Sequence, residues 1–446
     1  MSRLKVALPG CARAAVLAWM AIVTTAWPAL GAAEVADKAR PTVGWDLAKM
    51  SAPKSYPVED ASISNEYGRI EGVSPVWIEG EDYCGKPTRV FAWWGVPKGA
   101  SAERKAPAMV LVHGGGGTAF ADWVKTWVDR GYAAIAMDTC GGAPRGEADG
   151  KLHPRHPWSG PYGWQDSRGY DRGGLTDEWP YQAVSAVIRC HSFLRNRPEV
   201  DAGRIGITGI SWGGYLTSII MGVDGRFAFA APVYGCGWYD RNAYWDGSFK
   251  HAKWQVEDKA EVSARLAYGR WLRDWDARNF IGRTKCPVLR CNGTRDVFYT
   301  MEMTELSMAA LPSGTTAMMS IKNPMPHGHG ACGDPKEIAA WADFFLKGGP
   351  KPLEIVGVRY EGARFAVSFC GNDDRAVAAE LVYTTDADAP NPDREWKTCA
   401  AAADLAGGEV VFTVPDPAQL FFANIRTAKG EIYSTRLFLA PQSRRF

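Results

Sequence analysis

Apolar positions in the first three quarters of the chain fall into short runs that alternate with segments of helical spacing. Runs typical of buried strands occupy residues 73–79, 88–96, 108–113, 132–138, 204–208, 227–234, 286–291 and 316–321. Helical spacing occupies residues 119–130, 178–196, 215–221 and 335–346. Strands that are separated by helices connect through right-handed crossovers, so this alternation predicts an α/β fold with a mainly parallel sheet flanked by helices.

The pattern changes at the sequence Gly348-Gly349-Pro350. Beyond it, short strand patterns recur at 355–360, 364–370, 377–384, 410–414, 420–425 and 432–439, divided by Gly, Asp, Asn and Pro. Evenly spaced strands without helices predict a C-terminal all-β sandwich of immunoglobulin-like type over residues 350–446. The α/β part is expected to span residues 34–349.

Two stretches of the α/β part, residues 140–178 and 235–283, interrupt the alternation and are predicted to be loop insertions. Long irregular loops in a compact domain are often functional. Both stretches are rich in aromatic residues. In the first, these are Trp158, Tyr162, Trp164 and Tyr170. They are candidates for substrate contacts, or alternatively residues that pin the loop to the body of the protein.

The N-terminus has the features of a targeting segment. Arg3, Lys5 and Arg13 precede an apolar stretch at 14–27, and small residues follow at 29–33. This pattern predicts a cleaved signal peptide over residues 1–33 and hence a periplasmic or secreted protein, with an uncleaved anchor as the less favoured alternative. The net charge of +2 gives no reason to expect a nucleic-acid or membrane partner after cleavage. The 19 tryptophans point weakly to carbohydrate, because indole rings stack on sugar faces.

The most informative motif is Gly209-Ile210-Ser211-Trp212-Gly213, which lies between a strand pattern and a helix pattern. A serine on a sharp strand-to-helix turn has a strained backbone, and its neighbours must be small so that strand and helix can approach closely. This context predicts a nucleophile elbow with Ser211 as the nucleophile. The alternative is a glycine-rich turn with an incidental serine.

A serine hydroxyl needs a base to take its proton, and the base needs an orienting acid. Asp296 follows a late strand, where the acid is expected, although an aspartate there could also cap a turn. His327 and His329 compete for the role of base, and His327 is favoured because it lies nearer the strand end. A metal site at this histidine pair is disfavoured because no further ligands accompany it. We therefore predict no metal.

Acyl transfer also needs donors for the developing oxyanion. One predicted donor is the backbone N–H of Trp212, directly after the nucleophile. The other is expected from the glycine run that follows the strand at 108–113, with Gly114 or Gly115 as the donor. A histidine and glycine run at this place is a fairly specific companion of the elbow, although a glycine run can also be a flexible turn.

With these motifs in this order, residues 70–350 resemble the α/β-hydrolase superfamily, and within it the acetyl xylan esterase, dienelactone hydrolase and prolyl oligopeptidase-like group. The segments 201–206, 209–214 and 326–329 carry the likeness. It implies a serine hydrolase without a cofactor. The segment upstream of residue 70 is too short for the β-propeller of oligopeptidases, which counts against peptidase activity. The appended β-region is not part of the basic fold, so the substrate class does not carry over.

The prediction is therefore an exported serine esterase that removes acetyl or other acyl groups from carbohydrate, with Ser211, His327 and Asp296 as its triad. Its expected partner is a small-molecule or oligosaccharide ester. Two alternatives are an oligopeptidase-like serine peptidase and a catalytically inactive glycan-binding protein.

Overall fold

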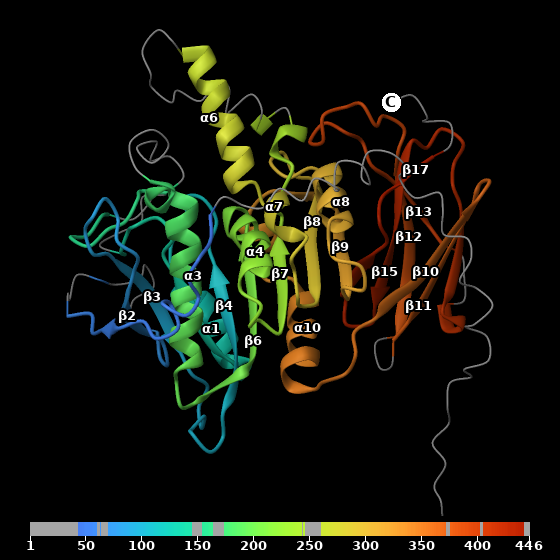
Figure 1. Cartoon of the computed structure of the whole chain (residues 1–446). Helices are drawn as coiled ribbons and strands as arrows, with labels where there is room; N and C mark the ends of the chain where they lie inside the picture. The colour runs from blue at the N-terminus through green and yellow to red at the C-terminus, as the bar shows by residue number, and fades with distance from the viewer. Residues whose placement is uncertain are drawn as a thin grey trace, which may run out of the picture.

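The computed structural model consists of an α/β part joined side by side to a β-rich C-terminal part (Figure 1). It describes residues 43–59, 63, 70–144, 154–163, 174–242, 244–245, 260–371, 375–401 and 405–440, without the side chains of residues 260–267 and 331–332. The predicted signal peptide, and Trp164 and Tyr170 of the first insertion, lie outside these residues. No helix within the described ranges is long and apolar enough to cross a membrane.

The α/β part is built on a mixed, twisted sheet. Its strands are β1 (Ser55–Tyr56), β2 (Ser74–Glu79), β3 (Arg89–Gly95), β4 (Ala106–Val112), β5 (Ala133–Met137), β6 (Val200–Ile210), β7 (Phe229–Val233), β8 (Val288–Arg295) and β9 (Ala317–Pro326). They lie in the order β1-β2-β3-β5-β4-β6-β7-β8-β9. Strands from β5 to β9 pair in parallel, whereas β1, β2 and β3 pair antiparallel at one edge.

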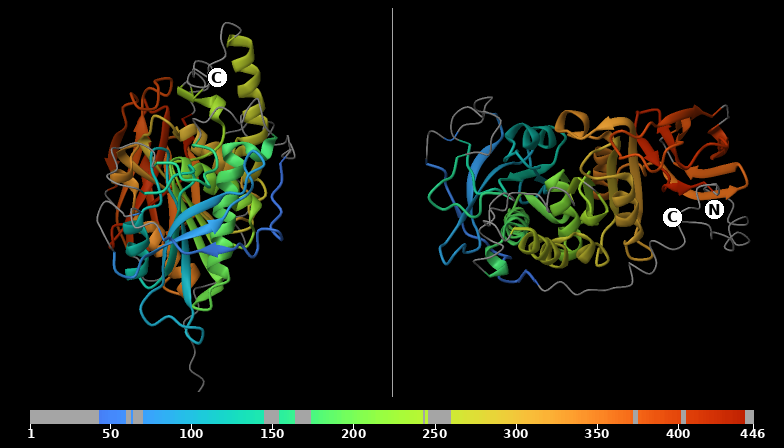
Figure 2. Two further views of the ribbon diagram at one scale, coloured as in Figure 1. Left: turned by 90° about the vertical axis from the view of Figure 1, so that its left-hand side faces the viewer. Right: turned by 90° about the horizontal axis from the view of Figure 1, so that it is seen from above.

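Helices cover both faces of this sheet. They are α1 (Ala121–Asp129), α3 (Trp179–Arg195), α4 (Trp212–Val223), α7 (Arg278–Ile281), α8 (Met301–Ala309), α9 (His329–Cys332) and α10 (Lys336–Lys347). Helices α1 and α10 lie on one face, and α3 and α4 on the other (Figure 2). A strand covered on both faces must be apolar throughout. All seven residues of β4 and all five of β5 and of β7 are accordingly buried.

The structure describes parts of both stretches that were predicted to be loop insertions. In the first, Trp158 is 37% exposed. The guanidinium carbon of Arg89 lies 4.1 Å from the centre of the Trp158 ring, and Trp77 packs against the same ring. These contacts match the interpretation that it pins the loop to the body. The second insertion contains the helix α6 (Ala260–Trp275), which projects from the body beside the carboxyl ends of the strands (Figure 1).

The C-terminal part is formed by antiparallel strands. They are β10 (Glu354–Glu361), β11 (Arg364–Cys370), β12 (Ala376–Thr384), β13 (Lys397–Ala400), β14 (Glu409–Thr413), β15 (Leu420–Thr427), β16 (Ile432–Ser434) and β17 (Phe438–Leu439). A three-stranded sheet, β10-β11-β14, faces the other strands, and Phe365 of β11 meets Phe421 of β15 at 5.1 Å between ring centres. The predicted fold class is confirmed: an α/β-hydrolase sheet with a β-rich C-terminal region.

One feature of the C-terminal part was not predicted. Its second sheet is continuous with the central sheet, because β16 pairs antiparallel with β9 through Ser434 and Met319. Together they form a single 14-stranded sheet, in which β16, β15, β12 and β13 follow β9. The side chain of Ser434 accepts the backbone N–H of Ile321 at 2.7 Å and reinforces the junction. The two parts therefore share backbone hydrogen bonds and are not merely linked by the chain.

Candidate active site

Ser211 occupies the turn between β6 and α4 with φ 58° and ψ −117°, a conformation that is strained for a residue with a Cβ. Two backbone bonds hold it there: its N–H donates to the Val233 carbonyl, and its own carbonyl accepts the N–H of Tyr215. The glycines around it are required for close approach. A Cβ on Gly209 would lie 2.3 Å from the Gly213 carbonyl oxygen, and a Cβ on Gly213 would lie 2.0 Å from the Val112 carbonyl oxygen.

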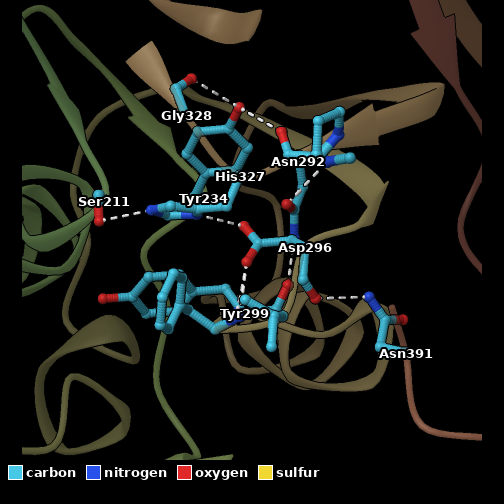
Figure 3. A network of polar contacts seen from close by, with 12 residues as sticks. Ser211, Tyr234, Asn292, Asp296, Tyr299, His327, Gly328 and Asn391 are labelled. Carbon is cyan, nitrogen blue, oxygen red and sulfur yellow. Dashed lines mark hydrogen bonds and ion pairs between the residues drawn. The ribbon is translucent and has the colours of Figure 1, made fainter. Parts of the chain in front are cut away.

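Three side chains that are distant in the sequence meet at the carboxyl end of the parallel strands (Figure 3). The Nε2 atom of His327 lies 2.8 Å from Ser211 Oγ, and its Nδ1 atom lies 2.9 Å from Asp296 Oδ2. In the neutral imidazole, Nδ1–H donates to the carboxylate, which leaves the Nε2 lone pair to accept the serine hydroxyl. This is the geometry that transfers a proton away from a serine nucleophile.

The carboxylate of Asp296 is fully buried and fixed on both oxygens. While Oδ2 binds His327, Oδ1 accepts the backbone N–H groups of Phe298 at 2.7 Å and Tyr299 at 3.0 Å. Bonds from its own turn of chain thus set the direction in which Asp296 faces the imidazole. Asp296 thus binds the N–H groups of its own turn, as a turn-capping aspartate does, and it also contacts His327.

Tyr234, at the end of β7, holds the histidine loop. Its ring lies 4.4 Å from the His327 ring, between centres, and its hydroxyl lies 3.2 Å from the carbonyl oxygens of both Pro326 and Gly328. Phe298 contacts His327 edge-on at 4.7 Å. Tyr234 was not predicted from the sequence. A signal was available, since the residue follows the strand next to the elbow strand, but nothing in the sequence shows that its hydroxyl reaches the histidine loop.

The hydrogen-bond contacts with Ser211 and Asp296 are made by His327 and not by His329. Its ring contacts Phe120, and its Nε2 atom lies 3.3 Å from where a Cβ on Gly114 would stand. Burial, together with the neighbouring imidazoles of His113 and His327, lowers the pKa of His329 to about 4. His329 is therefore neutral near pH 7. The structure thus brings His327 to Ser211 and Asp296, and puts His329 against the glycine loop.

That glycine loop is ordered by the buried side chain of His113. The backbone N–H of Thr139 donates to His113 Nε2 at 2.9 Å, so Nδ1 carries the proton and donates to the Gly114 carbonyl at 2.7 Å. The N–H of Gly117 also donates to this carbonyl. Because the peptide unit is planar and trans, the N–H of Gly115 points away from His113. This role of His113 was not predicted from the sequence.

Gly114 itself lies directly against the nucleophile. A Cβ at this position would be 3.0 Å from both the Ile210 carbonyl oxygen and the Ser211 Cβ. The other predicted oxyanion donor, the N–H of Trp212, belongs to the first residue of α4. The indole of Trp212 is packed among aromatic rings of the second insertion and its surroundings, which include Trp179, Tyr215, Tyr239 and Trp245. In the described parts of the chain, no group of three or more potential metal ligands comes together.

The sheet order, the elbow and the placement of Ser211 define the architecture of an α/β-hydrolase. The model of the prolyl oligopeptidase family matches residues 168–348. A solved structure, the acetyl xylan esterase from Paenibacillus sp. R4, superimposes with a TM-score of 0.51 at 20% identity, covering 67% of this chain and 91% of that one. The chain has the α/β-hydrolase fold, and over residues 168–348 it is similar to the prolyl oligopeptidase family.

Curated relatives are similar over part of their length. The uncharacterized peptidase YuxL of Bacillus subtilis is 25% identical over 274 residues, which are 58% of this chain and 37% of that protein. A probable dipeptidyl-peptidase 5 of Aspergillus clavatus is 24% identical over 200 residues, 42% of this chain and 24% of that protein. The chain thus spans between a quarter and about two fifths of the curated relatives that it matches.

Proposed function

We propose that the chain hydrolyses carboxylic esters by acyl transfer to Ser211. Ser211 Oγ attacks the ester carbonyl while His327 Nε2 takes its proton, and Asp296 stabilises the imidazolium that forms. His327 then gives this proton to the departing alcohol, and water releases the acyl group by the same steps in reverse. The observation that carries the proposal is the 2.8 Å contact of His327 Nε2 with Ser211 Oγ, combined with the 2.9 Å contact of Nδ1 with Asp296.

The oxyanion that forms during this attack needs hydrogen-bond donors at a fixed place. We propose the N–H of Trp212 as one donor. Of the two glycines predicted for the second, Gly115 is the better candidate, because the carbonyl in its peptide unit is occupied by His113 and Gly117. Gly114 then serves by its lack of a side chain, which lets the loop lie against Ser211.

We further propose that the ester is an acetyl or other acyl group carried on carbohydrate. Apart from Ser211 and Asp296, three aromatic rings lie around the His327 ring: Tyr234, Phe298 and Tyr299. Phe298 in turn meets Tyr244, which is 44% exposed, at 4.8 Å between ring centres. Uncharged aromatic surfaces suit a neutral acyl group and the apolar face of a sugar ring. The acetyl xylan esterase name of the structure that superimposes is consistent with this substrate.

A peptide substrate is the second candidate, and a specific observation favours it. The family model that matches is that of the prolyl oligopeptidases, and both curated relatives bear peptidase names. The proposed triad serves both reactions, because His327 could protonate a departing amine as it would an alcohol. The two proposals therefore differ in what binds beside Ser211 and not in the chemistry.

The deciding experiment compares acyl esters with peptide substrates on the same preparation. We expect p-nitrophenyl acetate and acetylated xylo-oligosaccharides to be turned over, and dipeptidyl and acyl-aminoacyl p-nitroanilides to react far more slowly. Ser211→Ala should lower kcat on the order of a millionfold and abolish labelling by a fluorophosphonate probe. Faster cleavage of the anilides would favour the peptidase. Absence of both turnover and labelling in the wild type would favour an inactive glycan-binding protein.

We propose, finally, that the protein is exported. The basic start, the apolar stretch at 14–27 and the small residues at 29–33 support a signal peptide. Mass spectrometry of the protein recovered from periplasmic and culture fractions should find an N-terminus near residue 34. An intact Met1 confined to the cytoplasmic fraction would contradict export.

A further inference from the structure

A loop of the C-terminal part reaches the turn that carries Asp296. The loop connects β12 with β13, and its Asn391 is 4% exposed. The Nδ2 atom of Asn391 donates to the carbonyl oxygen of Asp296 at 2.7 Å and lies 3.2 Å from that of Thr294 (Figure 3). A side chain almost 100 residues further along the chain therefore binds the backbone of the proposed acid.

The loop that carries Asn391 is itself anchored to the α/β part. Arg394 is buried, and its Nη1 atom lies 2.7 Å from Glu302 Oε1 at the start of α8. Its Nη2 atom donates to the carbonyls of Ala387 and Ala389, and the N–H groups of Asp393 and Arg394 both donate to Pro390. The contact with Glu302 ties the loop to α8, and the other bonds hold the loop's own turn. Together they fix the position from which Asn391 binds the turn of Asp296.

The turn that carries Asp296 is held from two sides. Strand β8 ends at Arg295, and the N–H of Asp296 makes a long bond of 3.3 Å to the Gly293 carbonyl. On one side, the Asn292 side chain donates to the Tyr299 carbonyl at 2.9 Å. On the other side, the Asn391 side chain lies against the carbonyls of Thr294 and Asp296. Thr294 and Asp296 are both fully buried, so loss of Asn391 would take a hydrogen bond from carbonyls that water does not reach.

We propose that Asn391 is a positioning residue of the hydrolytic site, through which the C-terminal part sets the orientation of Asp296 toward His327. The proposal rests on the function proposed above for Asp296. It makes the C-terminal part a component of the catalytic apparatus in addition to any role in binding. A shift of about 1 Å in a catalytic group can cost on the order of a hundredfold in rate, so a hydrogen bond on the backbone of Asp296 is enough to matter.

Asn391→Ala tests the proposal, with Asn424→Ala as the matched control. Asn424 is also a buried asparagine of the C-terminal part, 2% exposed, and its Nδ2 atom also donates across the junction, to the Ile321 carbonyl at 3.1 Å. It lies away from Asp296. Both variants should lose a similar amount of thermal stability. Only Asn391→Ala should lower kcat for p-nitrophenyl acetate, by about ten- to a hundredfold, with KM changed less than twofold.

Two further measurements separate positioning from stability. In Asn391→Ala, amide hydrogen exchange should accelerate in the peptide that contains Phe298 and Tyr299, whose N–H groups bind the carboxylate. The acid limb of the pH profile of kcat/KM should move to lower pH, because a carboxylate that is held less closely stabilises the protonated imidazole less. Asn424→Ala should change neither. Asn391→Asp, which keeps the shape and replaces the amide donors with acceptor oxygens when ionised, should resemble Asn391→Ala.

Wild-type kcat and pH profile in a folded Asn391→Ala or Asn391→Asp would overturn the proposal. So would failure of both to fold while Asn424→Ala folds, since Asn391 would then serve folding alone. A wild-type protein that neither turns over substrate nor reacts with the fluorophosphonate would instead refute the proposed function. In that case the hydrogen-exchange comparison still reports whether Asn391 orders the turn.

Discussion

The two histidines of the 326–330 loop are two residues apart and differ sharply in their surroundings. His327 lies between Ser211 and Asp296 and is covered by Tyr234 and Phe298. His329 begins α9, faces Phe120 and Gly114, and has its pKa lowered to about 4. The surroundings of the two imidazoles thus differ: His327 contacts a carboxylate and a serine hydroxyl, whereas burial beside other imidazoles keeps His329 neutral.

Replacing each histidine in turn should therefore give very different enzymes. We expect His327→Ala to lower kcat by about 10⁴- to 10⁶-fold, and His329→Gln to lower it no more than tenfold. Because the lowered pKa keeps His329 uncharged above about pH 5, the pH profile of kcat/KM in His329→Gln should match that of the wild type between pH 5 and 9. Steady-state rates with p-nitrophenyl acetate across this range provide the measurement. A lost or shifted acid limb in His329→Gln would assign the titrating base to His329.

For single residues, the sequence indicates which residue types stand at the expected places, but not the directions in which their side chains point. Ser211, Asp296 and the histidine pair were recognisable because each follows a strand pattern at the expected place. The choice between His327 and His329 depends on the direction in which each ring points, and both side chains leave the same short loop. Tyr234, His113 and Asn391 were missed because each makes hydrogen bonds with backbone groups that are distant in the sequence, and spacing along the chain does not encode such contacts.

The elements that build the site meet at very short distances. Strand β4 and the glycine loop after it lie against the turn between β6 and α4, where a Cβ would collide at positions 209 and 213 and would be tightly packed at position 114. The tightest approach is at Gly213, whose Cβ position falls 2.0 Å from the Val112 carbonyl oxygen. The least severe is at Gly114, where a methyl group would meet Ile210 and Ser211 at 3.0 Å.

Gly114→Ala should consequently fold yet lose activity. A Cβ at 3.0 Å from its neighbours requires the loop to move by a few tenths of an ångström, which displaces the proposed oxyanion donor of Gly115. We expect kcat to fall by about 10²- to 10³-fold, the loss typical of one oxyanion donor. Gly330→Ala is the control, because nothing lies within 4 Å of its Cβ position. Equal kcat values in the two variants would argue against the glycine loop as the oxyanion site.

The order of elements in the α/β part followed from the alternation of apolar runs and helical spacing. Helix α6, which spans Ala260–Trp275, lies within the second stretch that interrupts this alternation. The pairing of β16 with β9 could not be predicted from the sequence. Strands β9 and β16 are separated by more than 100 residues, and nothing in either sequence identifies its neighbour in the sheet.

The two parts of the molecule share a core as well as a sheet. A cluster of buried side chains joins Met301, Met308, Met319 and Ile321 of the α/β part to Val382, Leu420, Phe422 and Leu437 of the C-terminal part. Arg436 adds an ion pair with Glu305 of α8. An interface that is continuous with the core transmits unfolding from one side to the other, so the molecule is expected to unfold as one cooperative unit.

Phe422→Ala tests this cooperativity. The side chain is fully buried, so its truncation should lower the free energy of unfolding by about 3–5 kcal/mol. Urea unfolding followed by esterase activity and by hydrogen exchange in β10–β15 should give coincident midpoints, both lowered. Val377→Ala, in which the replaced side chain is 50% exposed, should leave the midpoints unchanged. Activity that survives after the C-terminal strands have exchanged would show that the parts unfold independently.

The junction between β9 and β16 has one more consequence, for how copies of the protein meet. The last parallel strand of a hydrolase sheet presents a row of backbone donors and acceptors, and such a row is a template for another chain. Here strand β16 of the same chain pairs with β9 at Met319, so a second molecule cannot pair with β9 at that position without displacing β16. The C-terminal part thus moves this edge of the sheet from β9 to β13, which is a short strand of four residues.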